Sequence, residues 1–154
     1  NMDGSKWILG DYMGIRLDHI GIAVNTLDEG EKFWKLLGLI PDDKDEEVLD
    51  QGVITRFIPI ANDMQKPAMI ELLEPTSEDT PIGRFIAKRG IGIQQICFEV
   101  DDIYQLIDEL LKSGVKMIDE VPRNGSKNCL IAFVHPKSTG GVLVELSQSN
   151  RKQS

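Results

Sequence analysis

Residues 17–24 read Leu-Asp-His-Ile-Gly-Ile-Ala-Val, and the polar pair Asn25-Thr26 follows them. A short apolar stretch that is rich in β-branched residues and closed by turn-forming residues predicts a β-strand. Its one imidazole, His19, lies among the positions expected to face inward. Residues 93–100 read Ile-Gln-Gln-Ile-Cys-Phe-Glu-Val, the same pattern at an offset of 76 (95 minus 19), with Gln95 in the place of His19. The chain therefore contains this strand twice.

The repeat continues beyond the strand. At the same offset, Leu27 corresponds to Ile103 and Gly38 to Gly114, so that each copy runs as strand, turn, helix, glycine and strand. A repeated unit of this length predicts a duplicated module whose two halves share one site. Further matches at this offset are Val24 with Val100, and Phe57 with Phe133.

Hydrophobic periodicity and turn signals predict the elements of both copies. In the first copy a helix is expected over about residues 27–37, with an apolar face made of Leu27, Phe33, Leu36 and Leu37. The other predicted elements are an acidic loop at 41–47, strands at 52–60 and 68–74 joined by a turn at 62–67, a short helix at 82–88, a helix at 103–113, a strand at 115–118, a polar loop at 122–127, and a closing hairpin of strands 129–135 and 142–147.

A chain of 154 residues is long enough for one domain with a sizeable core. We expect that domain over residues 16–148, with one module at 16–75 and the other at 93–148. Residues 1–15 have no clear period and are expected to form an N-terminal extension. Residues 149–154 are expected to form a polar tail.

Composition excludes several classes of function. The net charge of -8 argues against a nucleic-acid-binding protein, which needs a basic face to meet phosphates. No apolar run approaches the roughly 20 residues that span a bilayer, and no signal pattern opens the chain. The two cysteines, Cys97 and Cys129, lie in apolar strand-like runs, and we interpret them as buried free thiols in a reducing compartment. We therefore expect a cytoplasmic globular protein.

Four positions related by the repeat form a candidate metal site. His19 and Gln95 open the two copies, and Glu71 and Glu145 lie in the apolar strands that close them. A buried carboxylate needs a partner, and these four side chains can converge if each copy curves its sheet round a shared cavity. One imidazole, one amide oxygen and two carboxylates suit Co²⁺, Zn²⁺, Mn²⁺, Ni²⁺ or Mg²⁺. The alternative is an ordinary core histidine with solvent-facing glutamates.

The sequence also carries a resemblance. Residues 17–24, 71–75 and 77–81, and above all 135–146, which read His-Pro-Lys-Ser-Thr-Gly-Gly-Val-Leu-Val-Glu-Leu, resemble the methylmalonyl-CoA epimerase family. That family belongs to the vicinal oxygen chelate superfamily, together with the glyoxalases and extradiol dioxygenases. The resemblance implies an α+β fold of two βαβββ modules, whose curved, mixed sheets surround a divalent metal.

The resemblance assigns roles residue by residue. The family's first-strand histidine matches His19, its hairpin-strand ligand matches Glu71, and its C-terminal glutamate matches Glu145. The fourth ligand of the family is the second histidine of a His-His pair, where this chain has Gln95. Some members place a carboxylate just after a Gln-Gly-Val motif, where this chain has Thr55.

The implied reaction removes and returns a proton on the carbon between a thioester and a carboxylate. Glu145 is the first candidate for the general base. Inversion needs a second acid or base on the opposite face, for which Glu47, Glu71 or a water remain open. Lys137 and Ser138 lie in the loop that is expected to hold a substrate oxygen, although this loop also fits a plain hairpin turn. Positive charges that can meet CoA phosphates are Arg123 and Lys127, unless they are ordinary surface cations.

Three functions remain open at this stage. The first is a metal-dependent epimerase acting on an acyl-CoA thioester. The second is an enzyme similar to lactoylglutathione lyase, and the third is a metal-poor protein of the same fold that binds a small molecule without catalysis. Gln95, in place of a histidine, favours the third. By analogy with the superfamily we expect a homodimer.

Overall fold

The computed structural model describes residues 14–61 and 65–149, which divide into two compact units. The N-terminal unit contains residues 18–96, and the C-terminal unit contains residues 14–17 and 97–149. The division passes through the two repeated strands, β1 (Ile15–Ala23) and β5 (Gly92–Val100). The predictions for residues 1–13 and 150–154, and for residues 62–64 of the turn, lie outside the described residues.

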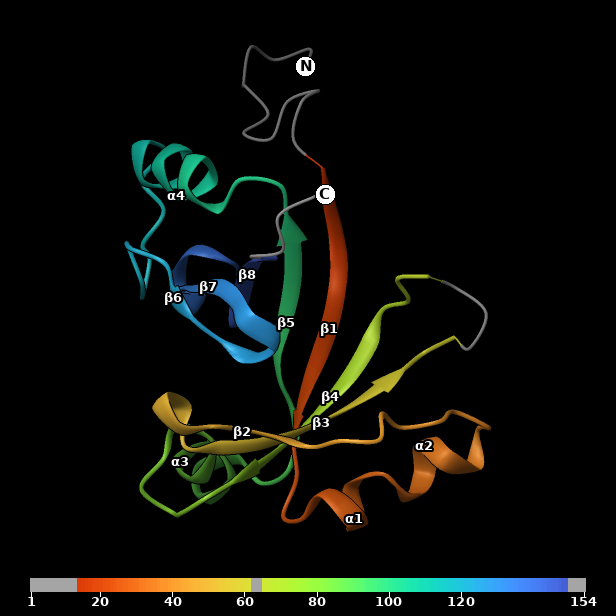
Figure 1. The fold of residues 1–154 in the computed structure, drawn as a ribbon. Coiled ribbons are helices and arrows are strands. Elements are labelled where there is room, and N and C mark those ends of the chain that lie inside the picture. Colours follow the sequence, from red (N-terminus) through yellow and green to blue (C-terminus); the bar gives the residue numbers. More distant parts are fainter. Residues whose placement is uncertain (1–13, 62–64, 150–154) are drawn as a thin grey trace. The chain divides into compact units, whose positions relative to one another are not determined.

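The N-terminal unit is built on four strands in the order β2-β3-β4-β1. Besides β1 these are β2 (Glu46–Val48), β3 (Val53–Pro59) and β4 (Met69–Pro75). Strand β3 pairs antiparallel with β2 and with β4, whereas β4 pairs parallel with β1, so this sheet is mixed as predicted. Figure 1 shows β3 and β4 side by side in yellow and yellow-green. The helices are α1 (Leu27–Gly30), α2 (Lys32–Leu36), the 3-10 turn η1 (Leu49–Gln51) and α3 (Pro81–Arg89).

The two faces of this sheet carry different cores. One face packs Ile58, Ile70 and Leu72 against Leu27 of α1 and Trp34 of α2. The other face packs Leu73, Val53 and Ala23 against Ile82 of α3. Glu71 lies on this second face, two residues before Leu73 on β4.

The predicted helix at 27–37 is two short helices, and its predicted apolar face is confirmed at Leu27 but wrong at the other three residues. Phe33, Leu36 and Leu37 are 59%, 84% and 59% exposed. The segment lies close to the chain that follows β1: a Cβ on Gly30 would lie 2.5 Å from Cγ1 of Val24. Leu27 and Trp34 pack inward instead.

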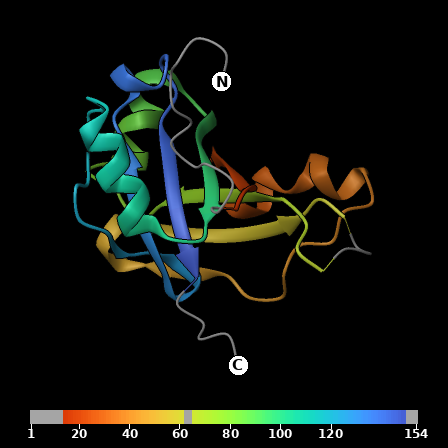
Figure 2. The ribbon, with the colours of Figure 1, turned by 90° about the horizontal axis from the view of Figure 1, so that it is seen from above.

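The C-terminal unit contains β6 (Arg123–Asn124), β7 (Cys129–Val134) and β8 (Val144–Ser149), in the order β8-β7-β6 and antiparallel throughout. Helix α4 (Ile103–Lys112) packs Leu106 and Ile107 on Ala132 and Leu146, on one face of β7 and β8. Figure 2 shows α4 in teal over these blue strands. The short 3-10 turns η2 (Ser126–Asn128) and η3 (Pro136–Ser138) flank β7.

The duplication is visible in matched local structure. Backbone N–H groups at the first helical residues, Leu27 and Ile103, donate to side-chain oxygens of Glu74 (2.8 Å) and Gln148 (2.7 Å). Thr26 and Asp102 cap the two helices from equivalent positions. Gly38 and Gly114 both have a left-handed φ, of 88° and 84°, which explains why a glycine ends each helical segment.

Several smaller predictions are corrected. Strand β2 begins inside the predicted acidic loop and ends one residue beyond it, and β6 lies inside the predicted polar loop. The predicted strand at 115–118 is reduced to one bridge, between Met117 and Val134. Strand β8 continues to Ser149, the first residue of the predicted tail. The helix at 82–88 is confirmed as α3, with Pro81 in its first turn.

Cys97 and Cys129 are both free thiols, as predicted, although Cys129 is only partly buried. No helix in the described ranges 14–61 and 65–149 has the length and hydrophobicity that a bilayer crossing requires.

Candidate metal and acid–base site

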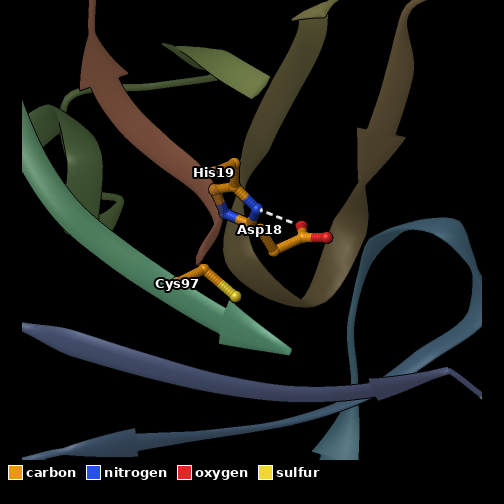
Figure 3. Close-up of side chains that lie close together, drawn as sticks. All are labelled: Asp18, His19 and Cys97. Carbon is orange, nitrogen blue, oxygen red and sulfur yellow. Dashed lines mark hydrogen bonds and ion pairs between the residues drawn. The ribbon is translucent and has the colours of Figure 1, made fainter. Parts of the chain in front are cut away.

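His19 lies on β1 and is 5% exposed. Its Nδ1 lies 2.7 Å from Oδ2 of Asp18, the contact drawn as a dashed line in Figure 3. A carboxylate only accepts hydrogen bonds when ionised, so Nδ1 carries the proton in this pair. The second ring nitrogen, Nε2, is then available as a lone-pair donor.

Two further predicted ligands meet this nitrogen. Oε1 of Glu71 and Nε2 of Gln95 each lie 3.4 Å from Nε2 of His19. Glu71 is 4% and Gln95 is 6% exposed. The N-terminal unit therefore brings together three of the four predicted ligands in a buried position.

Strand register explains why these side chains share a face. The parallel pairing of β1 with β4 places Gly21 beside Glu71, and His19 lies two residues before Gly21. Residues two apart on a strand point to the same face. Gly21 also makes room for Gln95, because a Cβ at position 21 would lie 2.6 Å from Cγ of Gln95. Phe57, paired with Glu71, closes the group with an edge contact to the His19 ring at 5.8 Å between centroids.

The cluster has the chemistry of a cation site. Nε2 of His19 and a carboxylate oxygen of Glu71 lie 3.4 Å apart, and two lone-pair acceptors this close favour a cation or a proton between them. The Gln95 amide is symmetric in shape, so a half-turn of its terminal bond exchanges nitrogen for oxygen and offers a third lone-pair donor. Imidazole, carboxylate and amide oxygen together fit a divalent metal of the borderline-to-hard class.

Strand register bears on one predicted acid–base residue. Glu46 pairs with Thr55, which shares its face of β3 with Phe57 and hence with Glu71. Glu47, the residue predicted from the sequence, points to the opposite face and is exposed. Thr55 itself is 2% exposed, and its hydroxyl donates to the backbone carbonyl of Glu46 at 3.4 Å. The carboxylate that shares the face of His19 is thus that of Glu46.

A cluster of ion pairs lies on the other face of the same strands. Arg56 binds both carboxylate oxygens of Asp45 at 2.8 Å, Asp28 at 2.9 Å and Glu31 at 3.1 Å. The bidentate hydrogen bonds from Arg56 hold the pKa of Asp45 below its ordinary value, and the same contacts raise the pKa of Arg56.

Glu145 lies on β8 in the C-terminal unit and is 5% exposed. It pairs with Phe133 of β7, as Glu71 pairs with Phe57. It faces away from α4, which packs on its neighbours Val144 and Leu146. The repeat therefore places a buried carboxylate beside an equivalent phenylalanine in each unit.

The remaining predicted residues lie near the surface of the C-terminal unit. Arg123 stacks over the ring of Phe133 at 5.7 Å and lies 3.4 Å from Asp119. Lys127 has a left-handed backbone in η2, and Lys137 is exposed in η3. The Ser138 hydroxyl accepts a hydrogen bond from the Lys116 backbone at 2.8 Å, so its visible role is to hold its loop.

Sequence reasoning missed Asp18 and Glu46. Asp18 could have been found because it directly precedes the candidate histidine and offers the carboxylate that a ligating imidazole usually requires. Glu46 carried no such signal, because two glutamates stand side by side in an acidic run. Only pairing with β3 decides which of them shares the face of His19.

The family model and the similar proteins point to the same family. Residues 18–133 match the family model described as the Glyoxalase/Bleomycin resistance protein/Dioxygenase superfamily. The chain is 38% identical to the mitochondrial methylmalonyl-CoA epimerase of Dictyostelium discoideum, over 94% of this chain and 86% of that protein. It is 36% identical to the ethylmalonyl-CoA/methylmalonyl-CoA epimerase of Cereibacter sphaeroides, over 86% of this chain and 97% of that protein.

The chain is also similar to a solved structure of a methylmalonyl-CoA epimerase. A variant of Streptomyces coelicolor methylmalonyl-CoA epimerase in complex with 2-nitronate-propionyl-CoA matches with a TM-score of 0.82 and 34% identity, over 90% of this chain and 97% of that chain. The match extends over nearly the whole of both chains, so it concerns the complete fold.

Proposed function

This chain belongs to the methylmalonyl-CoA epimerase family of the glyoxalase and dioxygenase superfamily, and from that premise we propose that it epimerises methylmalonyl-CoA or a closely related acyl-CoA. The observation that carries the proposal is the buried group of His19, Glu71 and Gln95 on one face of the N-terminal sheet. Burying three polar side chains costs free energy, so their presence together in the core favours a functional role over a purely structural one.

A divalent metal fits this group. His19 through Nε2, Glu71 through a carboxylate oxygen and Gln95 through its amide oxygen would hold it, with Asp18 fixing the tautomer of the imidazole. Glu145 completes the proposed set on the strength of the repeat, which gives it the same register and burial as Glu71. When bound, such an ion supplies the Lewis acidity that stabilises an enolate. Co²⁺, Zn²⁺, Mn²⁺, Ni²⁺ and Mg²⁺ all accept these donors.

Proton transfer is assigned to carboxylates of the chain. Epimerisation requires one group to remove the proton from the carbon between the thioester and the carboxylate, and another to return a proton on the opposite face. We assign these roles to Glu145 and Glu46. Glu46 replaces Glu47 in this assignment because only Glu46 shares the face of His19 and Glu71.

Recognition of the acyl-CoA is assigned to the surface cations of the C-terminal unit. The Streptomyces relative was solved with an acyl-CoA analogue, and a CoA ligand carries several phosphate charges. Arg123 and Lys127 remain our candidates for those phosphates, and Lys137 for a substrate carboxylate. The overall charge of -8 makes such local cations the part of the surface that can attract an anionic ligand.

The test is to supply each epimer of methylmalonyl-CoA to protein that has been dialysed and reloaded with one metal at a time. Conversion that requires Glu46, Glu145 and the metal supports the proposal. Turnover of the methylglyoxal–glutathione adduct instead would identify a lyase. Stoichiometric ligand binding without either reaction would identify a binding protein. The expected homodimer is checked separately by sedimentation at micromolar concentration.

A further inference from the structure

Strand β2 has only three residues and lies at the edge of its sheet. Short edge strands are weakly held, and a shift of register by one residue moves every side chain to the other face. In β2 such a shift exchanges two neighbouring glutamates, Glu46 and Glu47. An enzyme that uses one of them needs a device that fixes the register.

Arg56 contacts the residue directly before β2. It lies on β3 between Thr55 and Phe57, so its side chain points to the face opposite the one that these residues share with Glu71. Its Nε and Nη2 each lie 2.8 Å from a different carboxylate oxygen of Asp45, the residue directly before Glu46. Because neighbouring residues on a strand alternate between faces, drawing Asp45 to the far face turns Glu46 to the near face.

The guanidinium is itself held in place. Nη1 of Arg56 lies 2.9 Å from Asp28 and 3.1 Å from Glu31, which connect it to the α1–α2 segment. The segment before β2 has a second attachment, in which the Asp42 N–H donates to the Phe57 carbonyl at 2.8 Å. A planar guanidinium that binds three carboxylates in fixed directions defines an orientation as well as a charge, which a lysine cannot do.

We propose that Arg56 is a positioning residue, which acts through Asp45 to fix the register of β2 and so to present Glu46, rather than Glu47, to the substrate. This inference rests on the proposed epimerase function and on the role of Glu46 in it. Arg56 touches neither the substrate nor the metal ligands in this scheme. Its effect is therefore specific to the one proton transfer that Glu46 performs.

The experiment compares Arg56→Gln and Asp45→Asn with Arg84→Gln, a matched loss of an exposed arginine on α3. Each metal-loaded variant is incubated in D₂O with each epimer of methylmalonyl-CoA, and exchange of the C2 proton is followed together with inversion. A group that serves only one face of the carbon affects exchange from one epimer only. We expect Arg56→Gln to lower kcat by about 100-fold, as a displacement near 1 Å can, with little change in KM.

The exchange pattern decides the outcome. The proposal is supported if Arg56→Gln and Asp45→Asn lose exchange mainly from one epimer, the same one that Glu46→Gln loses, while Arg84→Gln behaves as wild type. It is overturned if both epimers lose exchange equally or if neither does. Should Arg56→Gln fail to fold, Asp45→Asn and Arg56→Lys are judged by the same criterion.

A measurement independent of activity separates this inference from the proposed function. Amide hydrogen exchange across residues 42–48 should accelerate in Arg56→Gln and stay unchanged in Arg84→Gln. Wild-type protein without epimerase activity refutes the proposed function even if this acceleration is seen. Unchanged protection of 42–48 in Arg56→Gln refutes the register device whatever the activity of the wild type.

Discussion

Oδ2 of Asp18 lies 2.7 Å from Nδ1 of His19, so the proton of the imidazole is held on the side away from Glu71 and Gln95. Two adjacent residues of one strand thus define which nitrogen carries the proton and which carries the lone pair. A carboxylate in this position also raises the basicity of the opposite nitrogen. The pair can act in this way because the side chain of Asp18 is itself mostly buried, at 16% exposed.

Asp18→Asn should weaken metal binding without removing a ligand. An amide can donate to Nδ1 as well as accept from it, so the tautomer of His19 is no longer fixed. We expect the affinity for Co²⁺ to fall by about 10- to 100-fold, measured by the visible spectrum during titration. Asp108→Asn, which removes an exposed carboxylate on α4, is the control and should bind as wild type. Equal affinity of Asp18→Asn and wild type would show that Asp18 does not act through His19.

Glu145→Gln should impair the protein more than Gln95→Ala. The first change removes a charged ligand and the candidate base, whereas the second removes a neutral donor that water can replace. We expect Glu145→Gln to lower kcat by about 100-fold or more. Gln95→His should tighten binding of Zn²⁺ or Co²⁺ and raise epimerase activity. Spectroscopic Co²⁺ titration of the three variants checks the order, and equal binding by wild type and Glu145→Gln would contradict it.

Much of the fold could be predicted because its signals are local. Capping residues and helix-ending glycines act over a few positions, and the repeat shows them twice, so the structure has them in equivalent places around Leu27 and Ile103. The apolar face at Phe33 and Leu36 is predicted wrongly, because burial depends on which side of the segment packs on the sheet, and here that side carries Leu27 and Trp34. No sequence pattern within the helix itself predicts which side packs on the sheet.

Some residues of the candidate site could be predicted from the sequence, and others could not. His19, Glu71 and Gln95 could be predicted because each interrupts an apolar strand at a position related by the repeat. Glu46 could not, because a strand of three residues is too short to show a period. Its face is set by pairing with Thr55. In our proposal Arg56 and Asp45 fix that pairing, and both look like ordinary surface charges in the sequence.

Gly21→Ala should destabilise the metal-free protein, and Gln95→Ala should relieve that effect. The new Cβ would lie 2.6 Å from Cγ of Gln95 and 3.1 Å from Cδ1 of Leu73. Overpacking of this kind costs about 1–3 kcal/mol. If the clash with Gln95 dominates, the double variant is more stable than the sum of the single changes by about 0.5 kcal/mol or more. Urea unfolding in the presence of a chelator measures all four proteins, and strict additivity would assign the strain to Leu73.

Acid should remove the contribution of the pair formed by Asp45 and Arg56. The pKa of Asp45 is lowered in the folded protein by its hydrogen bonds to Arg56. A carboxyl whose folded pKa lies below its unfolded value stabilises the fold above the unfolded pKa and loses that effect as pH falls. Asp45→Asn should therefore be less stable than wild type at pH 7, and the difference should shrink below about pH 4. Urea unfolding at pH 7, 4 and 3 tests the sign, and a difference that grows in acid would contradict it.

The two equivalent helix starts allow a reciprocal test of the duplication. Gln148 accepts the hydrogen bond of the buried Ile103 N–H, and Glu74 accepts that of Leu27. Gln148→Ala leaves a buried donor without its partner and should cost about 1–3 kcal/mol.

Exchanging the two acceptors keeps both hydrogen bonds and changes only the charge. A carboxylate at a helix N-terminus is favourable by about 0.3–1 kcal/mol, so Gln148→Glu should stabilise the protein and Glu74→Gln should destabilise it by a similar amount. Thermal unfolding resolves the larger effect as a shift of roughly 2–4 °C per kcal/mol for a chain of this size. Opposite signs for the two exchanges, with a clear loss for Gln148→Ala, would establish that both modules begin their helix with the same hydrogen bond. If Gln148→Ala were neutral, the bond at Ile103 would contribute nothing, and the matched geometry would be a relic of the duplication without energetic importance.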